Sequence, residues 1–419
     1  MSAESRGQVE VVNFGCRLNL VEGEALRRAA LAAGRDNLVI VNTCAVTAEA
    51  ARQGRQTIRR LKREAPEREI IVTGCAAQID PGAFAAMPEV AKILGNGEKA
   101  RAFVDGRGPR VAVGDIFARA QPPPPAGGSV EGHTRAFLAV QNGCDHRCSF
   151  CIIPYGRGAS RSIPLNDVLA AVEACLEAGA KEIVLTGVDL TAYGKDLEGT
   201  PRLGRLVKAI LRSAPSLVRL RLSSIDCIEA DADLLDALAS EARLMPHLHL
   251  SLQSGDDMIL KRMKRRHGRA DALRFCAELR RARPDIVFGA DLIAGFPTEN
   301  DEMFENTLAL VEACELTHLH VFPFSARPGT PAAKMPRVEA GVIAGRAKRL
   351  REAGDAALAR HLAAQVGKRL TLLAERGGVA RAEDFTKVRV GDVPAGQLIA
   401  AEIVGQDGKV LIGERTEAA

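Results

Sequence analysis

The sequence predicts an α/β protein in three parts: an N-terminal α/β unit with a parallel sheet, a partial (β/α)6 barrel and a small C-terminal antiparallel β barrel. Three observations support this fold class. Apolar, β-branched runs alternate with amphipathic stretches over the first hundred residues, and the same alternation resumes on a longer scale after residue 132. From residue 366 the pattern shortens to strand-like pieces separated by glycine-containing turns, which is typical of a small barrel.

The composition predicts a cytoplasmic protein with no membrane span. The chain has 419 residues, with 57 Lys plus Arg against 52 Asp plus Glu, and this net charge of +5 tolerates an anionic partner without proving one. It has no apolar run of about eighteen residues, and its start, Met1 to Arg6, lacks the pattern of a secretory signal. In a reducing cytosol we expect the ten cysteines to be ligands, nucleophiles or core residues rather than disulfides.

The first predicted unit covers residues 1–108 and has a βαβαβ pattern. Its strands are expected at Val9–Val12, Leu38–Val41 and Ile70–Val72, with helices at Val21–Ala33 and Ala48–Lys62. A helix between consecutive strands predicts a parallel sheet. Residues 109–132 are predicted to be a linker, because the run Pro122–Pro125 followed by Gly127 and Gly128 cannot continue a helix or a central strand.

The second predicted unit covers residues 133–365 and the third covers residues 366–419. Strands of the second are expected at Phe137–Gln141, Glu182–Leu185, Val218–Leu222, His247–Leu252, Ile286–Leu292 and His318–Phe322. Six strands that alternate with helices predict an open or partial barrel, which a helix over 338–365 closes. Strands of the third are expected at Arg369–Ala374, Lys387–Val390, Leu398–Val404 and Lys409–Ile412.

Three cysteines, Cys144, Cys148 and Cys151, follow the first strand of the second unit closely. Thiolates this close together can converge on one centre, and soft thiolate ligands suit an iron–sulfur cluster or zinc. Zinc is the alternative, with His146 as a nominal fourth ligand. His146 lies between two of the cysteines, however, where a tight loop has trouble aiming all four groups at one metal. The spacing therefore favours a [4Fe–4S] cluster with one iron left open.

A second set of cysteines, Cys16, Cys44 and Cys75, is spread over the first unit, and each follows a predicted strand by a few residues. The carboxyl ends of parallel strands lie on one edge of a sheet, so these three thiols are expected to share that edge. The alternative is three small buried residues at strand ends. The coincidence of all three positions favours a second cluster. We expect the other four to be structural: Cys175, Cys227, Cys276 and Cys314.

The spacing Cys-x-x-x-Cys-x-x-Cys after the first strand of a six-strand barrel resembles the radical S-adenosylmethionine superfamily. That resemblance implies that the open iron binds S-adenosylmethionine and that a 5′-deoxyadenosyl radical is generated. Longer strings resemble the methylthiotransferases, and they are Asn13-Phe-Gly-Cys-Arg-Leu-Asn19, Val41-Asn-Thr-Cys44, Val72-Thr-Gly-Cys-Ala-Ala-Gln78, Gly143 through Gly158, and Phe322-Pro-Phe-Ser-Ala-Arg-Pro-Gly-Thr330.

The methylthiotransferase resemblance implies a transferase with two [4Fe–4S] clusters that replaces a C–H bond by C–S–CH3. It implies a cluster domain at 1–108, a radical S-adenosylmethionine barrel at 133–365 and an RNA-binding TRAM barrel at 366–419. Cys16, Cys44 and Cys75 would hold the auxiliary cluster at which sulfur is methylated and then delivered. The expected partners are the tRNA anticodon stem-loop, a one-electron reductant protein and a sulfur donor.

Four further strings are most similar to the group that modifies N6-threonylcarbamoyladenosine at position 37 of tRNA. They are Arg157–Ser162, Leu185–Val188, Leu220–Ile225 and His247–Ser254. The sequence departs from the family at Thr298, where relatives often have glycine, and at Phe14 and Arg17. The alternatives are a methylthiotransferase for isopentenyladenosine tRNA or for a ribosomal-protein aspartate, and a non-catalytic iron–sulfur RNA-binding protein.

The resemblance also directs attention to the carboxyl ends of the barrel strands, where parallel barrels hold ligands. Thr186 and Gly187 would approach the amino group of S-adenosylmethionine by position, and Gln253 and Ser254 would face its ribose. Its adenine would pack on Ile293, Gly295 and Phe322. The alternative for each is an ordinary turn or core residue. Asp291, a carboxylate within an apolar run, would orient a ligand or cap the following loop.

Contact with RNA is expected at clusters of arginine. Arg52, Arg55 and Arg59 are spaced three to four residues apart, which places them along one helix face as a phosphate track. Arg157 and Arg161, just after the cluster loop, would steady the cosubstrate carboxylate or an RNA phosphate. The alternative for all of these cations is a solvated surface with ordinary ion pairs.

Overall fold

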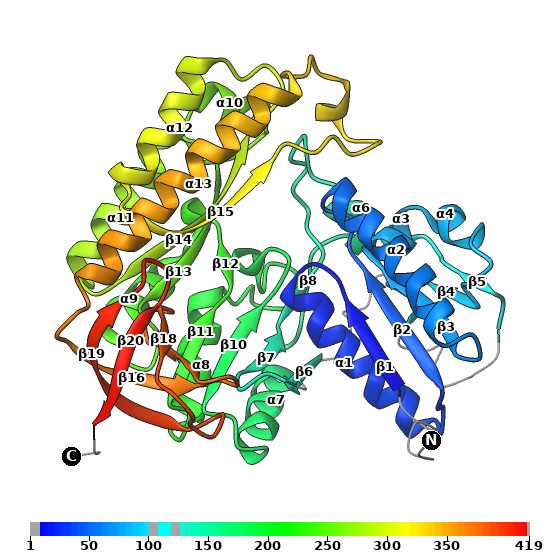
Figure 1. Cartoon of the computed structure of the whole chain (residues 1–419), viewed down its shortest axis with the longest axis horizontal. Coiled ribbons are helices and arrows are strands. Elements are labelled where there is room, and N and C mark those ends of the chain that lie inside the picture. The colour runs from blue at the N-terminus through cyan, green and yellow to red at the C-terminus, as the bar shows by residue number, and fades with distance from the viewer. Residues whose placement is uncertain (1–8, 100–107, 119–125, 131, 417–419) are drawn as a thin grey trace.

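The fold was analysed in a computed structural model that describes residues 9–99, 108–118, 126–130 and 132–416. Figure 1 shows an N-terminal α/β unit, a central unit of strands and helices, and a small C-terminal barrel against one end of the central unit. The sheets of the first two units are mostly parallel, and the C-terminal sheet is a closed barrel. The predicted α/β fold class is therefore confirmed.

The N-terminal unit is built on a five-stranded parallel sheet in the order β1-β2-β3-β4-β5. Its strands are β1 (Val9–Asn13), β2 (Leu38–Thr43), β3 (Glu69–Gly74), β4 (Lys92–Leu94) and β5 (Val111–Ala112), and its helices are α1 (Arg17–Ala32), α2 (Ala48–Glu64), α3 (Cys75–Ile79) and α4 (Pro81–Ala85). Every residue of β2 is buried, as expected of a central strand in a parallel sheet covered by helices. The short strands β4 and β5 were not predicted, and β5 lies inside the predicted linker.

The central unit contains all six predicted strands. They are β7 (Ala136–Ala139), β10 (Glu182–Thr186), β11 (Arg219–Leu222), β13 (His247–Gln253), β14 (Val287–Ala294) and β15 (Leu316–Pro323). They belong to two four-stranded sheets, ordered β11-β10-β7-β6 and β12-β13-β14-β15, where β12 is Ser224–Ile225. Helices between these strands are α7 (Leu165–Glu177), α8 (Leu203–Ser213), α9 (Ala232–Ser240), α10 (Asp257–Arg262), α11 (Arg269–Ala282) and α12 (Asp301–Ala313). The main core lies between these strands and helices.

The predicted linker contains a strand, β6 (Ala126–Ser129), which pairs antiparallel with β7. The sequence argued against a central strand at Gly127 and Gly128, and β6 is an edge strand. A Cβ atom at Gly127 would lie 2.5 Å from Leu138 Cδ1, so glycine allows the close approach of these two strands. The run Pro122–Pro125 lies outside the described residues.

The C-terminal unit follows the long helix α13 (Ala340–Ala363). Its strands are β16 (Arg369–Ala374), β17 (Val379–Ala382), β18 (Lys387–Arg389), β19 (Leu398–Gln406) and β20 (Leu411–Thr416), closed in the order β16-β17-β18-β20-β19. Most of the pairings are antiparallel as predicted, but β18 and β20 pair in parallel. Strand β17 was not predicted, because its small residues follow a Gly-Gly turn and give no apolar run.

Phe385, in the loop between β17 and β18, joins the C-terminal barrel to the base of the central unit. Its ring stacks on His247, the first residue of β13, with 5.0 Å between ring centroids. The Arg221 guanidinium lies 5.0 Å from the centre of the same ring. Arg219 donates to the Thr371 carbonyl at 2.7 Å. These contacts lie toward the amino ends of the strands, so the carboxyl ends remain free for a site.

Candidate cluster and cosubstrate site

The loop that carries Cys144, Cys148 and Cys151 runs from β8 (Gln141–Asn142) to α6 (Ile153–Arg157). Two backbone bonds shape it: the Cys144 amide donates to Gly158 at 3.1 Å, and the Cys151 amide donates to Cys148 at 3.0 Å. Burial, with a smaller contribution from the neighbouring Cys148, raises the pKa of the Cys151 thiol to about 12. The structure thus gathers the three thiols in one loop, where metal binding would have to displace their protons.

The zinc alternative with His146 does not fit this loop. His146 Nε2 lies 2.8 Å from a carboxylate oxygen of Asp189 and 3.5 Å from one of Glu229. Ligand atoms of Cys144, His146 and Asp189 come within 4.8 Å of one another, in a group that contains neither Cys148 nor Cys151. The imidazole is engaged by carboxylates and does not complete a site with all three thiols.

The second set of cysteines lies at the carboxyl edge of the N-terminal sheet. Cys16 precedes α1, Cys44 follows β2, and Cys75 begins α3 directly after β3. Burial, with smaller contributions from Cys75 and Cys16, raises the pKa of the Cys44 thiol to about 11, so the three thiols are close enough to interact. A Cβ atom at Gly15 would lie 2.6 Å from Cys44 Sγ. Glycine there lets the Cys16 loop approach Cys44, as three ligands of one cluster require.

The two sets of cysteines face each other across the junction of α3 and α6. A Cβ atom at Gly156 in α6 would lie 3.0 Å from Cys75 Cβ and 3.4 Å from its Sγ. Cys75 also acts electrostatically on Cys151. Both sets therefore border one region between the N-terminal and central units, although the strands that position them belong to separate sheets.

Arg157 connects the two units at this junction. Its side chain is 2% exposed, and its Nε donates to Cys75 Sγ at 3.3 Å. The other guanidinium nitrogens donate to the Glu22 carboxylate and to Asn19 Oδ1. Burial alone would raise the pKa of Glu22, but Arg157 and Lys99 lower it to about 2. The guanidinium thus belongs to a charged network beside a predicted cluster ligand.

The predicted contacts of Arg157 and Arg161 with a phosphate or with the cosubstrate do not fit this structure. Arg157 is enclosed by the network described above. Arg161 is also buried, and it donates to the Arg157 carbonyl at 2.9 Å. An RNA phosphate has no access to either guanidinium. The sequence shows charge but not burial, so it gave no signal for this internal role.

Arg265 makes a similar contact with the cysteines of the central unit. It belongs to a basic stretch of sequence that is typical of a surface, yet its Nη1 lies 3.7 Å from Cys148 Sγ. Its Nη2 donates to Asp226 at 2.8 Å and to the Ser251 carbonyl at 2.6 Å. Each set of cysteines therefore has an arginine against one of its sulfur atoms.

Five of the predicted cosubstrate residues lie at the carboxyl ends of β10, β13, β14 and β15, as expected. They are Thr186, Gly187, Gln253, Ile293 and Phe322. Gln141, which was not predicted, supports this edge. Its side chain accepts from the Asp189 backbone amide at 2.9 Å and donates to the Gly143 carbonyl at 2.8 Å. Polar groups such as the Gln141 amide therefore lie at the carboxyl ends of the strands, in the place where parallel barrels hold ligands.

Ser254 and Gly295 do not fit their predicted contacts with ribose and adenine. Ser254 is buried, and its hydroxyl is hydrogen bonded to Thr307 Oγ1 at 3.0 Å. A Cβ atom at Gly295 would lie 2.4 Å from Ile343 Cγ1, so Gly295 packs against α13. Thr298, the departure from the family pattern, has a φ of +67°, a conformation in which glycine is unstrained. These three residues shape loops beside the site.

The predicted phosphate track on α2 is partly free. Arg52 is paired with Glu49 at 2.6 Å, whereas Arg59 lines a groove of about 530 Å³. The groove residues are Phe14, Gln53, Gln56, Thr57, Arg59, Arg60 and Arg63. Arg327, from the loop after β15, acts electrostatically on both Cys44 and Arg55. The basic face of α2 therefore lies near the cysteine edge rather than on a remote surface.

Comparison with known proteins identifies the family. Residues 138–311 match the family described as the radical SAM superfamily, and residues 8–95 match uncharacterized protein family UPF0004. The chain is 49% identical over 398 residues to the threonylcarbamoyladenosine tRNA methylthiotransferase MtaB of Rickettsia prowazekii, an alignment that covers 94% of each protein. The chain belongs to the tRNA methylthiotransferase family.

Other methylthiotransferases are also similar. MtaB of Thermotoga maritima is 36% identical, with 88% of this chain and 86% of the relative covered. The tRNA-2-methylthio-N(6)-dimethylallyladenosine synthase of Cereibacter sphaeroides is 34% identical, with 99% of each covered. Membership in this family makes the chain a radical S-adenosylmethionine transferase, and it confirms the predicted family and enzyme class.

A solved structure supports the fold of this methylthiotransferase. The radical S-adenosylmethionine methyltransferase TsrM of Kitasatospora setae, with cobalamin and a [4Fe–4S] cluster bound, has a TM-score of 0.52 at 19% identity. The match covers 75% of this chain and 69% of TsrM. In the described part of the chain, no helix is both long and apolar enough to cross a membrane.

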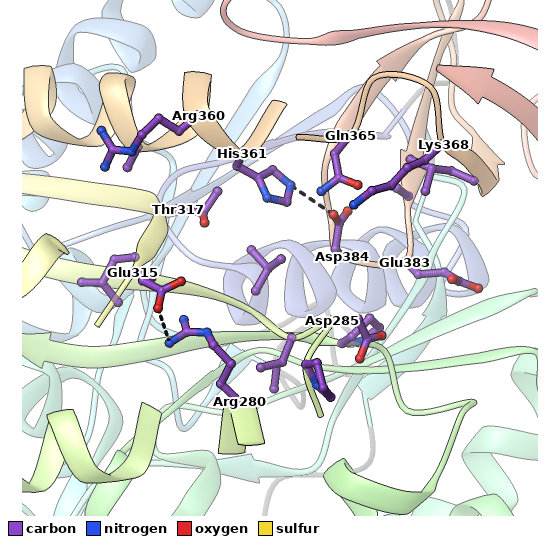
Figure 2. A pocket seen from close by; sticks show the side chains of 18 of the residues that line it. Arg280, Asp285, Glu315, Thr317, Arg360, His361, Gln365, Lys368, Glu383 and Asp384 are labelled. Atoms are coloured by element: carbon purple, nitrogen blue, oxygen red, sulfur yellow. Dashed lines mark hydrogen bonds and ion pairs between the residues drawn. The ribbon is translucent and has the colours of Figure 1, made fainter. Parts of the chain in front are cut away.

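A pocket of about 660 Å³ lies at the other end of the methylthiotransferase barrel (Figure 2). It is lined by the amino ends of β14 and β15, by α13 and by the C-terminal barrel, and none of its lining residues is a cysteine. Its charges are mixed, with Arg280 paired to Glu315 at 3.2 Å and His361 bonded to Asp384 at 3.1 Å. This pocket is therefore separate from the cluster and cosubstrate site.

Proposed function

We propose that the chain converts N6-threonylcarbamoyladenosine at position 37 of tRNA to its 2-methylthio derivative, by radical conversion of C–H to C–S–CH3. The observation that carries this proposal is the meeting of the two sets of cysteines at the α3–α6 junction, where Gly156 lies against Cys75. The substrate rests on the relatives named as threonylcarbamoyladenosine tRNA methylthiotransferases. A radical generator and a sulfur carrier would have to share a chamber, and this arrangement supplies one.

The donor groups fit two iron–sulfur clusters. Cys144, Cys148 and Cys151 would hold the cluster whose fourth iron is open, and Cys16, Cys44 and Cys75 would hold the auxiliary cluster. The thiols of each set interact with one another, and Gly15 gives the approach that the auxiliary set needs. When bound, the clusters and S-adenosylmethionine would supply the radical and the sulfur.

The residues of this chain would position those groups. Arg157 and Arg265 would donate hydrogen bonds to Cys75 and Cys148, and such bonds to cluster sulfur tune reduction potential. S-adenosylmethionine would lie along Thr186, Gly187, Gln253, Ile293 and Phe322, which occupy the carboxyl ends of four barrel strands. Burial of Arg157 would keep water from this side of the chamber.

We divide the chain into a cluster domain at 1–108, a linker at 109–132, a radical S-adenosylmethionine domain at 133–365 and a TRAM domain at 366–419. The tRNA anticodon stem-loop would approach across the α2 groove, with Arg55 and Arg59 toward the phosphates. Arg52 would join them after releasing Glu49. A one-electron reductant protein and a sulfur donor complete the reaction, which we place in the cytoplasm.

Mass spectrometry of tRNA nucleosides tests this function. Cells without the gene should lose the 2-methylthio derivative of N6-threonylcarbamoyladenosine and regain it with the wild-type gene. The Cys75→Ala variant should fail to restore the nucleoside, whereas Cys175→Ala, at a buried cysteine outside both sets, should restore it. Loss of the methylthio-isopentenyl nucleoside instead would assign the chain to the other tRNA branch. An unchanged nucleoside profile would remove the tRNA assignment.

A further inference from the structure

Two histidines and an aspartate meet on neighbouring strands of the central unit, beneath the predicted cosubstrate residues. His249 is on β13, Asp291 on β14 and His320 on β15. The strands pair in parallel with His249 opposite Gly289 and with Asp291 opposite His320. We propose that His249, Asp291 and His320 form a binding site for one divalent transition-metal ion of the zinc or ferrous class.

The distances among the three side chains are those expected of ligands around one ion. His249 Nε2 lies 2.9 Å from Asp291 Oδ1, and His320 Nδ1 lies 3.2 Å from the same oxygen. Ligand atoms of all three residues lie within 4.8 Å of one another. Adjacent ligands about 2.0–2.2 Å from a metal are separated by roughly 2.8–3.4 Å. Two imidazoles and one carboxylate are also a common donor set for zinc and non-haem iron.

Gly289 makes room for this arrangement. A Cβ atom there would lie 2.7 Å from His249 Nδ1 and 2.8 Å from the His318 backbone oxygen. The second contact is with backbone, which cannot move aside as a flexible side chain can. Any larger residue at position 289 would therefore displace the His249 ring from Asp291. The glycine at this strand position is needed for the three ligand atoms to converge.

The site is polar and open to solvent at one ligand. The side chains of His249, Asp291 and His320 are 12%, 25% and 61% exposed. Toward the base of the strands, His247 is buried and neither of its ring nitrogens has a hydrogen-bond partner among the described residues. Imidazole and carboxylate groups therefore meet at the level of His249 and Asp291, and an ion can enter from the exposed His320 side.

The position of the site indicates what the ion would contact. Ile293 and Phe322 follow Asp291 and His320 by two residues on β14 and β15. Residues two apart on a strand project from the same face about 6.5–7 Å from each other. With three protein ligands, the ion would keep at least one position for an oxygen ligand. A carboxylate of the substrate nucleoside fits that position, and this last role rests on the proposed function.

Metal analysis of the holoenzyme tests the site, with zinc as the probe. Anaerobically reconstituted enzyme is dialysed against a zinc buffer, and zinc and iron per chain are measured together. The wild type should retain one zinc ion per chain that His320→Ala and Asp291→Asn lose, at unchanged iron content. His361→Ala is the matched control, because His361 is likewise hydrogen bonded to a half-buried aspartate, Asp384, in the distant pocket of Figure 2. It should keep the zinc.

X-ray absorption at the zinc edge identifies the ligands. The proposal predicts nitrogen and oxygen neighbours at about 2.0–2.1 Å and no sulfur at about 2.3 Å. Equal zinc in the wild type and in both site variants would overturn the proposal, and so would a sulfur shell, which would place the zinc on cysteines. Neither readout requires tRNA or turnover. Absence of this zinc would therefore leave the nucleoside test of the proposed function intact.

Discussion

Substitution of Gly143 by alanine should remove one iron–sulfur cluster and spare the other. Gly143 has a φ of +74° and precedes Cys144. A Cβ atom there would lie 1.8 Å from the Ala159 backbone oxygen, whereas real Cβ atoms essentially never come closer than 3.0 Å. The backbone on one side of the contact must then move by about 1 Å, and it is tied to the Cys144 amide through Gly158.

Gly179→Ala is the control for backbone strain. Gly179 has a φ of +85°, and its Cβ would meet no atom within 4 Å. Both alanines pay about 1–2 kcal/mol for the left-handed conformation, but Gly143→Ala alone also has the clash. Two [4Fe–4S] clusters bring about eight irons, so Gly179→Ala should keep about eight irons and Gly143→Ala about four.

Iron analysis after anaerobic reconstitution measures this effect, together with 5′-deoxyadenosine formed on reduction with S-adenosylmethionine. Gly143→Ala should form none of that product, because the affected cysteines are those with the predicted open iron. Retention of about eight irons and of wild-type product by Gly143→Ala would refute the geometric reasoning. A loss that Gly179→Ala shares would show that strain, and not the clash, controls the loop.

Three other predictions follow from the described contacts. Arg157→Met leaves buried Glu22 with Lys99 as its charged partner, so the free energy of unfolding in urea titrations should fall by about 3–5 kcal/mol. The control Arg212→Met, at an exposed position, should change it by less than about 0.5 kcal/mol. The folded-state pKa of Glu22, about 2, is below its unfolded value, so this stabilisation is present above the unfolded pKa and is lost as the pH falls toward 2. Glu22→Gln should therefore weaken the pH dependence of the free energy of unfolding in urea between about pH 5 and pH 3. An unchanged pH dependence would contradict the pairing. The double substitution Arg55→Glu and Arg59→Glu should weaken tRNA binding, and it should reduce the slope of log affinity against log salt concentration by roughly 2 if each arginine meets one phosphate. Filter binding measures this slope, with Arg212→Glu as the control. An equal slope in the double variant and in the control would remove α2 from the interface.

The strands of the central unit and both sets of cysteines were predictable because the relevant signals are local. Each strand is marked by an apolar run, as in β10, or by apolar residues at every second position, as in β11 and β13. The carboxyl ends of parallel strands share an edge whatever the exact packing. Cys16, Cys44 and Cys75 could therefore be brought together from the sequence alone. The subdivision of the chain into domains stays a prediction.

The errors arose where the outcome depends on neighbours far away in the sequence. Arg157 was expected to face a ligand, but its partners Glu22 and Asn19 lie on α1 in another unit. Ser254 was expected to face the ribose, but the bulge beside Gln253 turns that segment toward α12 and Thr307. Edge strand β6 was missed because Gly127 is needed for the close approach of β6 to β7, and local sequence propensity does not report such a contact.

The contacts of Phe385 have a consequence for how the C-terminal barrel is oriented. Its ring is held by His247 and approached by Arg17, Arg135, Arg221 and Arg381, which come from all three parts of the chain. A flexible tether would let the C-terminal barrel rotate, but these contacts of Phe385 fix its orientation relative to the central strands. RNA bound to the C-terminal barrel would then lie at a fixed distance from the cysteine edge. Removal of the Phe385 ring should let that distance vary before it weakens RNA binding.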